Sequence, residues 1–468
     1  MFTEPLRIFG HALFGRQDLP IPEWLFAWAA SLVLIISFFA LSVAWQKPKF
    51  EEDRWRAGPR WWSTALLNPV VQTLFGLVSV FLLGLIVWSG LKGTEAPDRN
   101  FSVTFAYVTV YLGFVLLSVV FGDVFRAFNP WRAIARVVGG AFKLGAGQSA
   151  PAPLSYPEWL GRWPAAAGLF GVAWLELAYG QSGFQVVGLT PHTVAIATLV
   201  YTAYTFVAMA LFGSEKWLER GETFSVYFHM FSTLSGFEAR DGRIGLRRPL
   251  SAAGKWIAEA PGSIFLVLLT IGVTTFDGAA EGTLSGPIST MEGWMTDAGI
   301  GPVVSLRLTN SIFLLLSIAF VNGLFWAGIY GMHTVRGGRS TRELGHLFGH
   351  AFIPIALAYL IAHYFSGIVF SEQAQFTYLL SDPLGDGSDI FGTASGGIDY
   401  GVISANAIWY VQVASLVIGH VTALVLGHDR ALKVYGDARL AARSQYWMLA
   451  LMVGFTSLGL FLLSQSNG

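Results

Sequence analysis

The sequence contains no cysteine, and charged residues make up only 12% of its 468 positions. The absence of cysteine excludes disulfides, thiolate metal sites and cysteine nucleophiles. A soluble protein of ordinary composition has about 25% charged residues. Because this chain has so few charges and 54% hydrophobic residues, we expect it to use lipid as its solvent. Its formal net charge of zero gives no reason to expect a nucleic-acid partner.

Several catalytic motifs are also missing. The chain has no G-x-S-x-G elbow, no H-E-x-x-H zinc motif, no closely spaced H-x-H pair and no P-loop. Residues 1–23 contain acids and prolines but no apolar core of signal-peptide length, so we expect no cleaved leader.

What the chain does contain is a series of long apolar segments. A helix crosses a bilayer core of roughly 30 Å with about 20 apolar residues. Ten segments fit this length closely enough to predict membrane spans: 24–45, 70–91, 103–121, 164–180, 192–213, 262–276, 307–332, 351–370, 405–427 and 446–463. The expected fold class is therefore an all-α integral membrane protein, a single polytopic bundle of about ten transmembrane helices.

Lysine and arginine are distributed unevenly among the segments between these spans. Alternate connections hold 24 of the 29 basic residues, and the other connections and the tails hold four, with Arg307 at a helix start. Cytoplasmic loops retain positive charge. The pattern predicts that both termini lie outside the cytoplasm and that segment 214–261 is the longest cytoplasmic loop.

Two cytoplasmic loops contain signals of local structure. Residues 131–142 alternate bulky apolar and basic side chains, which predicts an amphipathic helix on the membrane surface. Residues 219–234 are expected to form a second surface helix. Residues 238–244 contain Asp241-Gly242, which favours a type I′ hairpin turn.

The external loops 277–306 and 371–404 are acidic and contain no lysine or arginine apart from Arg307 at the border of the first. The second loop is also rich in glycine. We expect them to form an ordered lid or a docking face for an exported subunit. Their candidate site residues are Asp277, Asp382, Asp386 and Asp389.

Glu176, His363 and His420 lie well inside predicted spans, where polar groups are costly and often functional. Glu176 and His363 each lie about 12 residues from the cytoplasmic end of their span, roughly 18 Å deep, so they could meet. His420 lies on the span that follows the span of His363, and the two imidazoles could face one another. An alternative role for Glu176 is a partly hydrated position near the outer headgroups.

More histidines surround the start of the eighth span. Ser340 and Glu343 form a capping-box pattern that predicts a helix start before the membrane, and Pro354 predicts a kink. His346, His350 and His428 are expected near the cytoplasmic surface, where they could form a cluster.

These histidines leave several interpretations open. A transition-metal site of His363, His420 and Glu176 is one. Haem is less favoured, because His350 and His363 would point about 140° apart on a helix and the ninth span offers no matching pair. A proton relay is another interpretation, and hydrogen-bonded histidines that only specify helix packing are the last.

The chain resembles a known family at ten short segments. They are GRQDLPIP (15–22), FGDVFRAFNPWRA (121–133), YPEWLGRWP (156–164), TFDG (275–278), AHYF (362–365), SDPLG (381–385), DIFGTA (389–394), WYVQV (409–413), GHV (419–421) and HDRA (428–431). Together they resemble the bacterial multi-spanning proteins described as the membrane subunit of fenitrothion hydrolase. The resemblance implies an inner-membrane subunit of a complex that cleaves an organophosphate triester, with exported soluble subunits as partners. It implies no catalytic residues for the membrane subunit.

The expectation is therefore an inner-membrane subunit that anchors or serves an exported enzyme. The alternatives are a proton- or metal-coupled transporter or channel, and a metal- or haem-dependent membrane oxidoreductase.

Overall fold

The computed structural model describes residues 23–50, 54–146, 152–181, 188–335 and 339–465, and the chain it describes is almost entirely helical. Within these residues, seven helical segments are long and apolar enough to cross a membrane. Five of them are single helices: α3 (Pro69–Lys92), α9 (Pro191–Phe212), α13 (Ser263–Ala280), α15 (Pro302–His333) and α19 (Ala405–Tyr435). A sixth is formed by α4 (Phe101–Thr104), η2 (Phe105–Gly113) and α5 (Phe114–Phe121) in succession. The seventh is formed by α16 (Thr341–Phe348), η5 (Gly349–Phe352), α17 (Ile353–Phe376) and α18 (Tyr378–Ser381).

Further apolar helices complete the bundle. Helices α20 (Ala438–Ser444) and α21 (Tyr446–Gln465) meet at a 42° bend and provide an eighth span if they are counted as one. The others are α1 (Glu23–Ala44) and α8 (Trp163–Trp174), which continues as η4 (Leu175–Tyr179). The protein is thus a multi-pass membrane protein, and each of the ten predicted segments coincides with a helix or a succession of helices.

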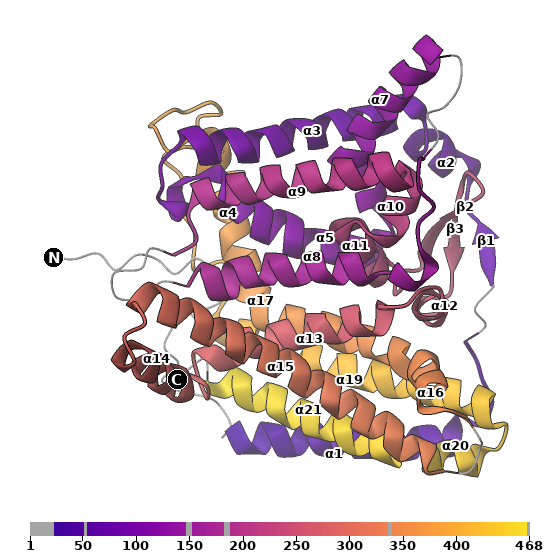
Figure 1. The fold of residues 1–468 in the computed structure, drawn as a ribbon. Helices are drawn as coiled ribbons and strands as arrows, with labels where there is room; N and C mark the ends of the chain where they lie inside the picture. Colours follow the sequence, from indigo (N-terminus) through magenta and orange to yellow (C-terminus); the bar gives the residue numbers. More distant parts are fainter. Residues whose placement is uncertain (1–22, 51–53, 147–151, 182–187, 336–338, 466–468) are drawn as a thin grey trace.

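The long helices run roughly side by side, so alternate connections gather at opposite ends of the bundle (Figure 1). We call one end the sheet end, because it contains β1 (Trp55–Ala57), β2 (Phe237–Arg240) and β3 (Arg243–Arg247) in the order β1-β3-β2. Its helices are α2 (Arg60–Leu66), α6 (Phe125–Phe128), α7 (Pro130–Ala146), η3 (Glu158–Leu160), α10 (Ser214–Arg220), α11 (Thr223–Ser232) and α12 (Ala253–Ala258). The opposite, loop end contains η1 (Pro97–Arg99), α14 (Ser285–Asp297) and residues 382–404.

The predicted hairpin at the sheet end is confirmed. Strands β2 and β3 pair with Arg240 opposite Arg243, so Asp241 and Gly242 form the turn. Both turn residues have positive φ, 50° and 73°, as a type I′ turn requires. Strand β1 adds to β3 with Trp55 opposite Arg247, which joins two loops that are far apart in the sequence.

The two predicted surface helices have different outcomes. Helix α7 exposes Val137, Val138 and Phe142, as a helix lying on a membrane would. The prediction of one surface helix over 219–234 is wrong: the chain forms α10 and α11, and α11 is buried against α5 and α8. The physical reason is that most residues of α11 are apolar and are covered by the neighbouring helices, and within α11 only His229 is exposed.

Helices α17 and α19 pack closely in the interior, as their antiparallel order predicts. A Cβ atom on Gly419 would lie 2.3 Å from Cβ of Ala358, so only glycine permits this approach. The eighth predicted span does begin at a capped helix, because Ser340 accepts a hydrogen bond from the amide of Glu343. Pro354 then starts α17 after the short η5 turn, which confirms a break in the helix there.

Candidate functional site

Asp277 lies at the centre of a polar group inside the bundle. Its Oδ2 accepts a hydrogen bond of 2.6 Å from the hydroxyl of Tyr364 and lies 2.8 Å from Nε2 of His363. Asp277 projects from α13 and the other two from α17. Asp277 is 7% exposed, and His363 and Asp277 form an ion pair when the imidazole is protonated.

The sequence placed Asp277 in an external loop, and this prediction is wrong. Helix α13 continues through Asp277 to Ala280. The predicted span ended at Phe276 because a carboxylate is costly in lipid. Nearly all of α13 is buried by other helices, so Asp277 faces protein donors rather than lipid.

Glu176 belongs to the same group but does not have the expected partner. It is buried in η4, and its charge interacts with that of Asp277. The sequence predicted that Glu176 could pair directly with His363, but the carboxylate that binds this imidazole is Asp277. We call Glu176, Asp277, His363 and Tyr364 the carboxylate cluster. If both carboxylates are ionised in this poorly polar interior they repel one another, and a bound proton relieves the repulsion.

Two π-helical segments border the carboxylate cluster. Segment η4 contains Glu176, and η2 contains Tyr111, whose hydroxyl interacts electrostatically with both carboxylates. π-Helical turns are rare and are frequent at functional sites. The sequence gave no signal for either segment, because their residues are as apolar as those of an ordinary span.

Polar side chains extend from the carboxylate cluster toward both ends of the bundle. Toward the loop end, Glu372 of α17 accepts a 3.0 Å hydrogen bond from Thr109 of η2. Toward the sheet end, the ring of Tyr111 stacks on Tyr227 of α11, with centroids 5.3 Å apart. Sequence reasoning missed Thr109, Tyr111 and Tyr227, since hydroxyl and aromatic side chains in apolar segments are common. It assigned Glu372 to the acidic external loop 371–404, but α17 continues through this residue.

Closer to the sheet end, His229 of α11 forms a pair at 3.1 Å with Asp123, which follows α5. Their side chains are 30% and 48% exposed, so water reaches them. Burial alone would raise the pKa of Asp123, but the hydrogen bond and charge of His229 and the charges of Arg126 and Arg132 hold it below its ordinary value.

His420 is separate from the carboxylate cluster. It is fully buried on α19, where its Nδ1 donates to the carbonyl of Leu416 at 2.8 Å and its ring lies 6.0 Å from that of Tyr359. The part of the chain that the structure describes contains no group of three or more histidine or acidic residues placed to hold a metal ion. The predicted metal site of His363, His420 and Glu176 is therefore not formed in this geometry.

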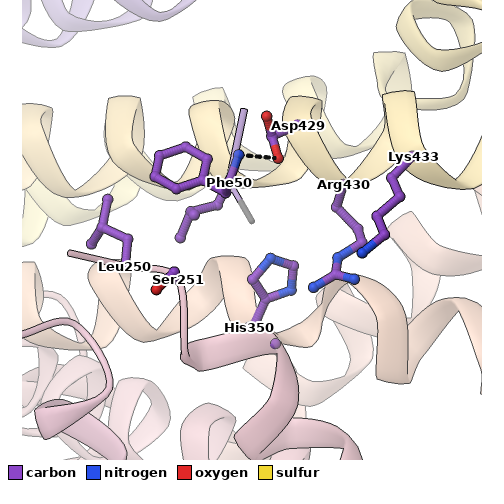
Figure 2. A pocket seen from close by; sticks show the side chains of 9 residues that line it. Phe50, Leu250, Ser251, His350, Asp429, Arg430 and Lys433 are labelled. Carbon is purple, nitrogen blue, oxygen red and sulfur yellow. Dashed lines mark hydrogen bonds between the residues drawn. The ribbon is translucent and has the colours of Figure 1, made fainter. Parts of the chain in front are cut away.

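The three histidines expected at the surface do not form one cluster either. His350 is buried and lines a small pocket with Ser251, Arg430 and Lys433 (Figure 2). This pocket has about 20 Å³ of free volume, enough for about one water molecule.

His428 has different partners. Its Nε2 lies 3.0 Å from the carbonyl oxygen of Trp45, and its Nδ1 lies 3.1 Å from the amide nitrogen of Gln445. His346 lies in the last turn of α16. The antiparallel order brought these histidines to one end of the bundle, as expected, but the sequence could not say which way each side chain points.

The acidic residues of loop 382–404 shape the loop itself. Asp382 accepts hydrogen bonds from the amides of Asp386 and Gly387 and from the hydroxyl of Ser388. Asp389 accepts from the hydroxyl of Ser381 and the amide of Ala394, and Asp386 accepts from the amide of Ser388. These carboxylates stabilise the conformation of the loop, and the role of this loop as an external lid or docking face stays a prediction.

Fold and site together define a class: an α-helical multi-pass membrane protein with an interior cluster of titratable side chains. Comparisons with protein-family models, curated proteins and solved structures find no match to this chain.

Proposed function

We propose that this protein transfers protons within its membrane-spanning bundle through the carboxylate cluster. The observation that carries the proposal is the single carboxylate oxygen of Asp277 that binds both His363 and Tyr364, with the buried Glu176 interacting electrostatically with Asp277. Burying such groups is expensive, and their usual role within a membrane is to bind or pass ions and protons. Carboxylate, imidazole and phenol side chains can each hold or donate a proton.

The proposed route starts at the sheet end with Asp123 and His229 and continues to Tyr227, two residues from His229 on α11. Tyr227 stacks on Tyr111, which interacts electrostatically with Asp277. From there Glu372 continues toward the loop end on the same helix as His363. Tyrosine hydroxyls both donate and accept hydrogen bonds, so they suit the intermediate steps.

The proposed topology has ten crossings. The bent pair α20–α21 is one, and α1 and α8–η4 add two to the seven long helices. The sheet end contains the loops with 24 basic residues, which favours the cytoplasm as its location. Both termini then lie outside the cytoplasm, and we place the protein in the bacterial inner membrane.

The decisive experiment is proton flux into proteoliposomes that contain the purified full chain and a trapped pH-sensitive dye. Asp277→Asn should reduce flux at least about tenfold, because an amide cannot exchange the proton. Asp297→Asn is the matched control, since Asp297 is exposed at the end of α14, and it should leave flux unchanged. Normal flux through folded Asp277→Asn, or no flux through the unaltered protein, would contradict the proposal.

A second function is favoured by the surface of loop 382–404. This loop is ordered by its aspartates, yet Ile390, Phe391 and Val402 are 60% or more exposed. Exposed apolar side chains on an ordered surface are typical of protein interaction sites. They fit the exported partner that the resemblance to the fenitrothion hydrolase membrane subunit implies, with the membrane chain as anchor.

This second proposal has its own test. The chain, affinity-purified from native membranes in mild detergent, should bring with it an exported protein that hydrolyses phosphotriesters. The double variant Ile390→Ser and Phe391→Ser should lose that protein while expression stays normal. Retention of the partner by the double variant would refute a docking role for this loop.

A further inference from the structure

A large cavity lies among the helices on the side of η2 and η4 away from α13. Its free volume is about 580 Å³, within the range of ligand pockets. Helices α3, α8 and α9 and segment η2 form its walls, and Trp131 of α7 and Phe224 of α11 lie at the sheet end of it.

The cavity is long rather than round. Its lining follows α8 from Pro164 to Leu175, a rise of about 16 Å at 1.5 Å per residue. It follows α9 over a similar distance, from Val194 to Tyr204. Each lined stretch is about half as long as the roughly 30 Å thickness of a bilayer core. The two stretches do not lie at the same depth, because the α8 stretch starts one residue from the sheet end of its helix and the α9 stretch starts three residues from the loop end of its helix.

The polar atoms around the cavity are already bound by the protein. Tyr107 donates to the carbonyl of Val172, and the indole of Trp131 donates to Thr202. The hydroxyls of Ser79, Thr198 and Tyr201 also have protein acceptors: Phe75, Val194 and Glu222, respectively. A polar solute or a file of water would find few partners here, because water in a cavity needs about two to four polar contacts.

The cavity also reaches the outer surface of the bundle. Val200 and Tyr204 line it and are 64% and 44% exposed. Both project from α9, a helix whose surface is mostly uncovered by the described protein. An occupant can therefore enter sideways from the bilayer without crossing a headgroup layer.

We infer that this cavity holds one acyl chain of a membrane lipid. The occupant is hydrocarbon because the walls offer apolar contacts and few unsatisfied polar groups. It is a lipid chain because lipid is the solvent at the opening, and each lined stretch is about as long as the hydrocarbon depth of one leaflet. The chain is retained by dispersion contacts that the walls of an empty cavity would lack.

The position of the cavity connects it to the carboxylate cluster. Tyr107 belongs to η2 and Leu175 to η4, and both line the cavity. Glu176, the next residue after Leu175, lies in the carboxylate cluster. The acyl chain would thus pack against the same π-helical segments that position the titratable groups.

Gly171 offers a direct test. It lines the cavity on α8, and a Cβ atom added there would meet no atom within 4 Å. The side chain of Gly171→Leu would therefore occupy the space of the acyl chain without a clash at its base. Gly84 of α3 is the matched control, because its Cβ would also meet nothing and it does not line the cavity.

The experiment uses the full chain in nanodiscs containing phosphatidylcholine with a photoreactive diazirine on one acyl chain. Cross-linked peptides from η2 and α8 are expected after illumination, and Gly171→Leu should lose most of them. Gly84→Leu should keep them. Ala197→Leu fills the cavity from the opposite wall on α9 and provides a second variant if Gly171→Leu does not fold.

Three outcomes would overturn the inference. One is labelling of η2 and α8 that is no stronger than labelling of the exposed faces of α3 and α15. Another is labelling that both cavity-filling variants leave unchanged. The third is native mass spectrometry in which these folded variants retain as many lipids as the unaltered protein.

Discussion

Two tyrosines on α17 allow a sharp test of the charge on Asp277. Tyr364 donates to Oδ2 of Asp277 at 2.6 Å, and Tyr359, five residues earlier, donates to the carbonyl of Phe455 at 2.7 Å. Both side chains are 5% exposed, and both lie on the same helix. Tyr→Phe removes the same hydroxyl from each, so only the acceptor differs.

The expected magnitudes follow from the acceptors. A hydrogen bond to a neutral carbonyl contributes about 0.5–1.5 kcal/mol to stability, and one to a charged group about 1.5–3 kcal/mol. Tyr364→Phe should therefore lower the free energy of unfolding by about 1 kcal/mol more than Tyr359→Phe. It should also slow proton flux, whereas Tyr359→Phe should not, because Tyr359 lies outside the carboxylate cluster.

Steric trapping in bicelles measures the free energy of unfolding of both variants under native lipid-like conditions. Proteoliposome flux is measured on the same preparations. If the two substitutions cost the same, Asp277 does not carry the charge that this reasoning assigns to it. If Tyr359→Phe alone reduced flux, the route through Asp277 would be wrong.

Three further predictions concern structure outside the spans. Burial alone would raise the pKa of Asp382, but the amides of Gly387 and Asp386 and the hydroxyl of Ser388 hold it below its ordinary value. The folded loop therefore binds fewer protons than the open loop, and its stability should fall as pH drops from about 5 to below about 3, as hydrogen exchange of residues 382–394 can show. Gly242→Ala should lower the free energy of unfolding by about 1–2 kcal/mol, because the φ of 73° is unfavourable for alanine. An added Cβ atom would meet no neighbour, so the whole effect comes from the backbone. An unchanged free energy of unfolding would argue against the type I′ turn. Arg162→Met should lower the free energy of unfolding by about 1–3 kcal/mol, because the buried guanidinium donates to the carbonyl of Trp256 and the hydroxyl of Ser263. An unfolding free energy equal to that of the unaltered protein would show that these acceptors find other donors.

Patterns that depend on local chemistry were predictable from the sequence. Apolar length placed the helices, and the Asp241-Gly242 and Ser340-Glu343 pairs located a turn and a helix start correctly. Each of these signals comes from a few consecutive residues whose own backbone or side-chain geometry decides the result.

Features that depend on which helices meet were not predictable. The sequence identified Glu176 and His363 as buried titratable groups, but Asp277 was assigned to a loop because its partners lie 86 and 87 residues away. Helix α11 was misplaced for a related reason: an apolar segment within a basic loop gives no sign of whether it meets lipid or protein. The histidines show the same limit, since His350 and His428 share an end of the bundle but not a partner.

The π-helical segment η4 has a consequence for engineering. In a π turn each hydrogen bond joins residues five apart rather than four apart, so the turn contains one residue more than an α-helical turn. Deleting one residue at this position should let the helix close into regular α geometry while the flanking parts keep their places. Every side chain within the altered turn would then be rotated by about 100°, turning Glu176 away from Asp277. One deletion could thus separate the two carboxylates without changing a single functional group.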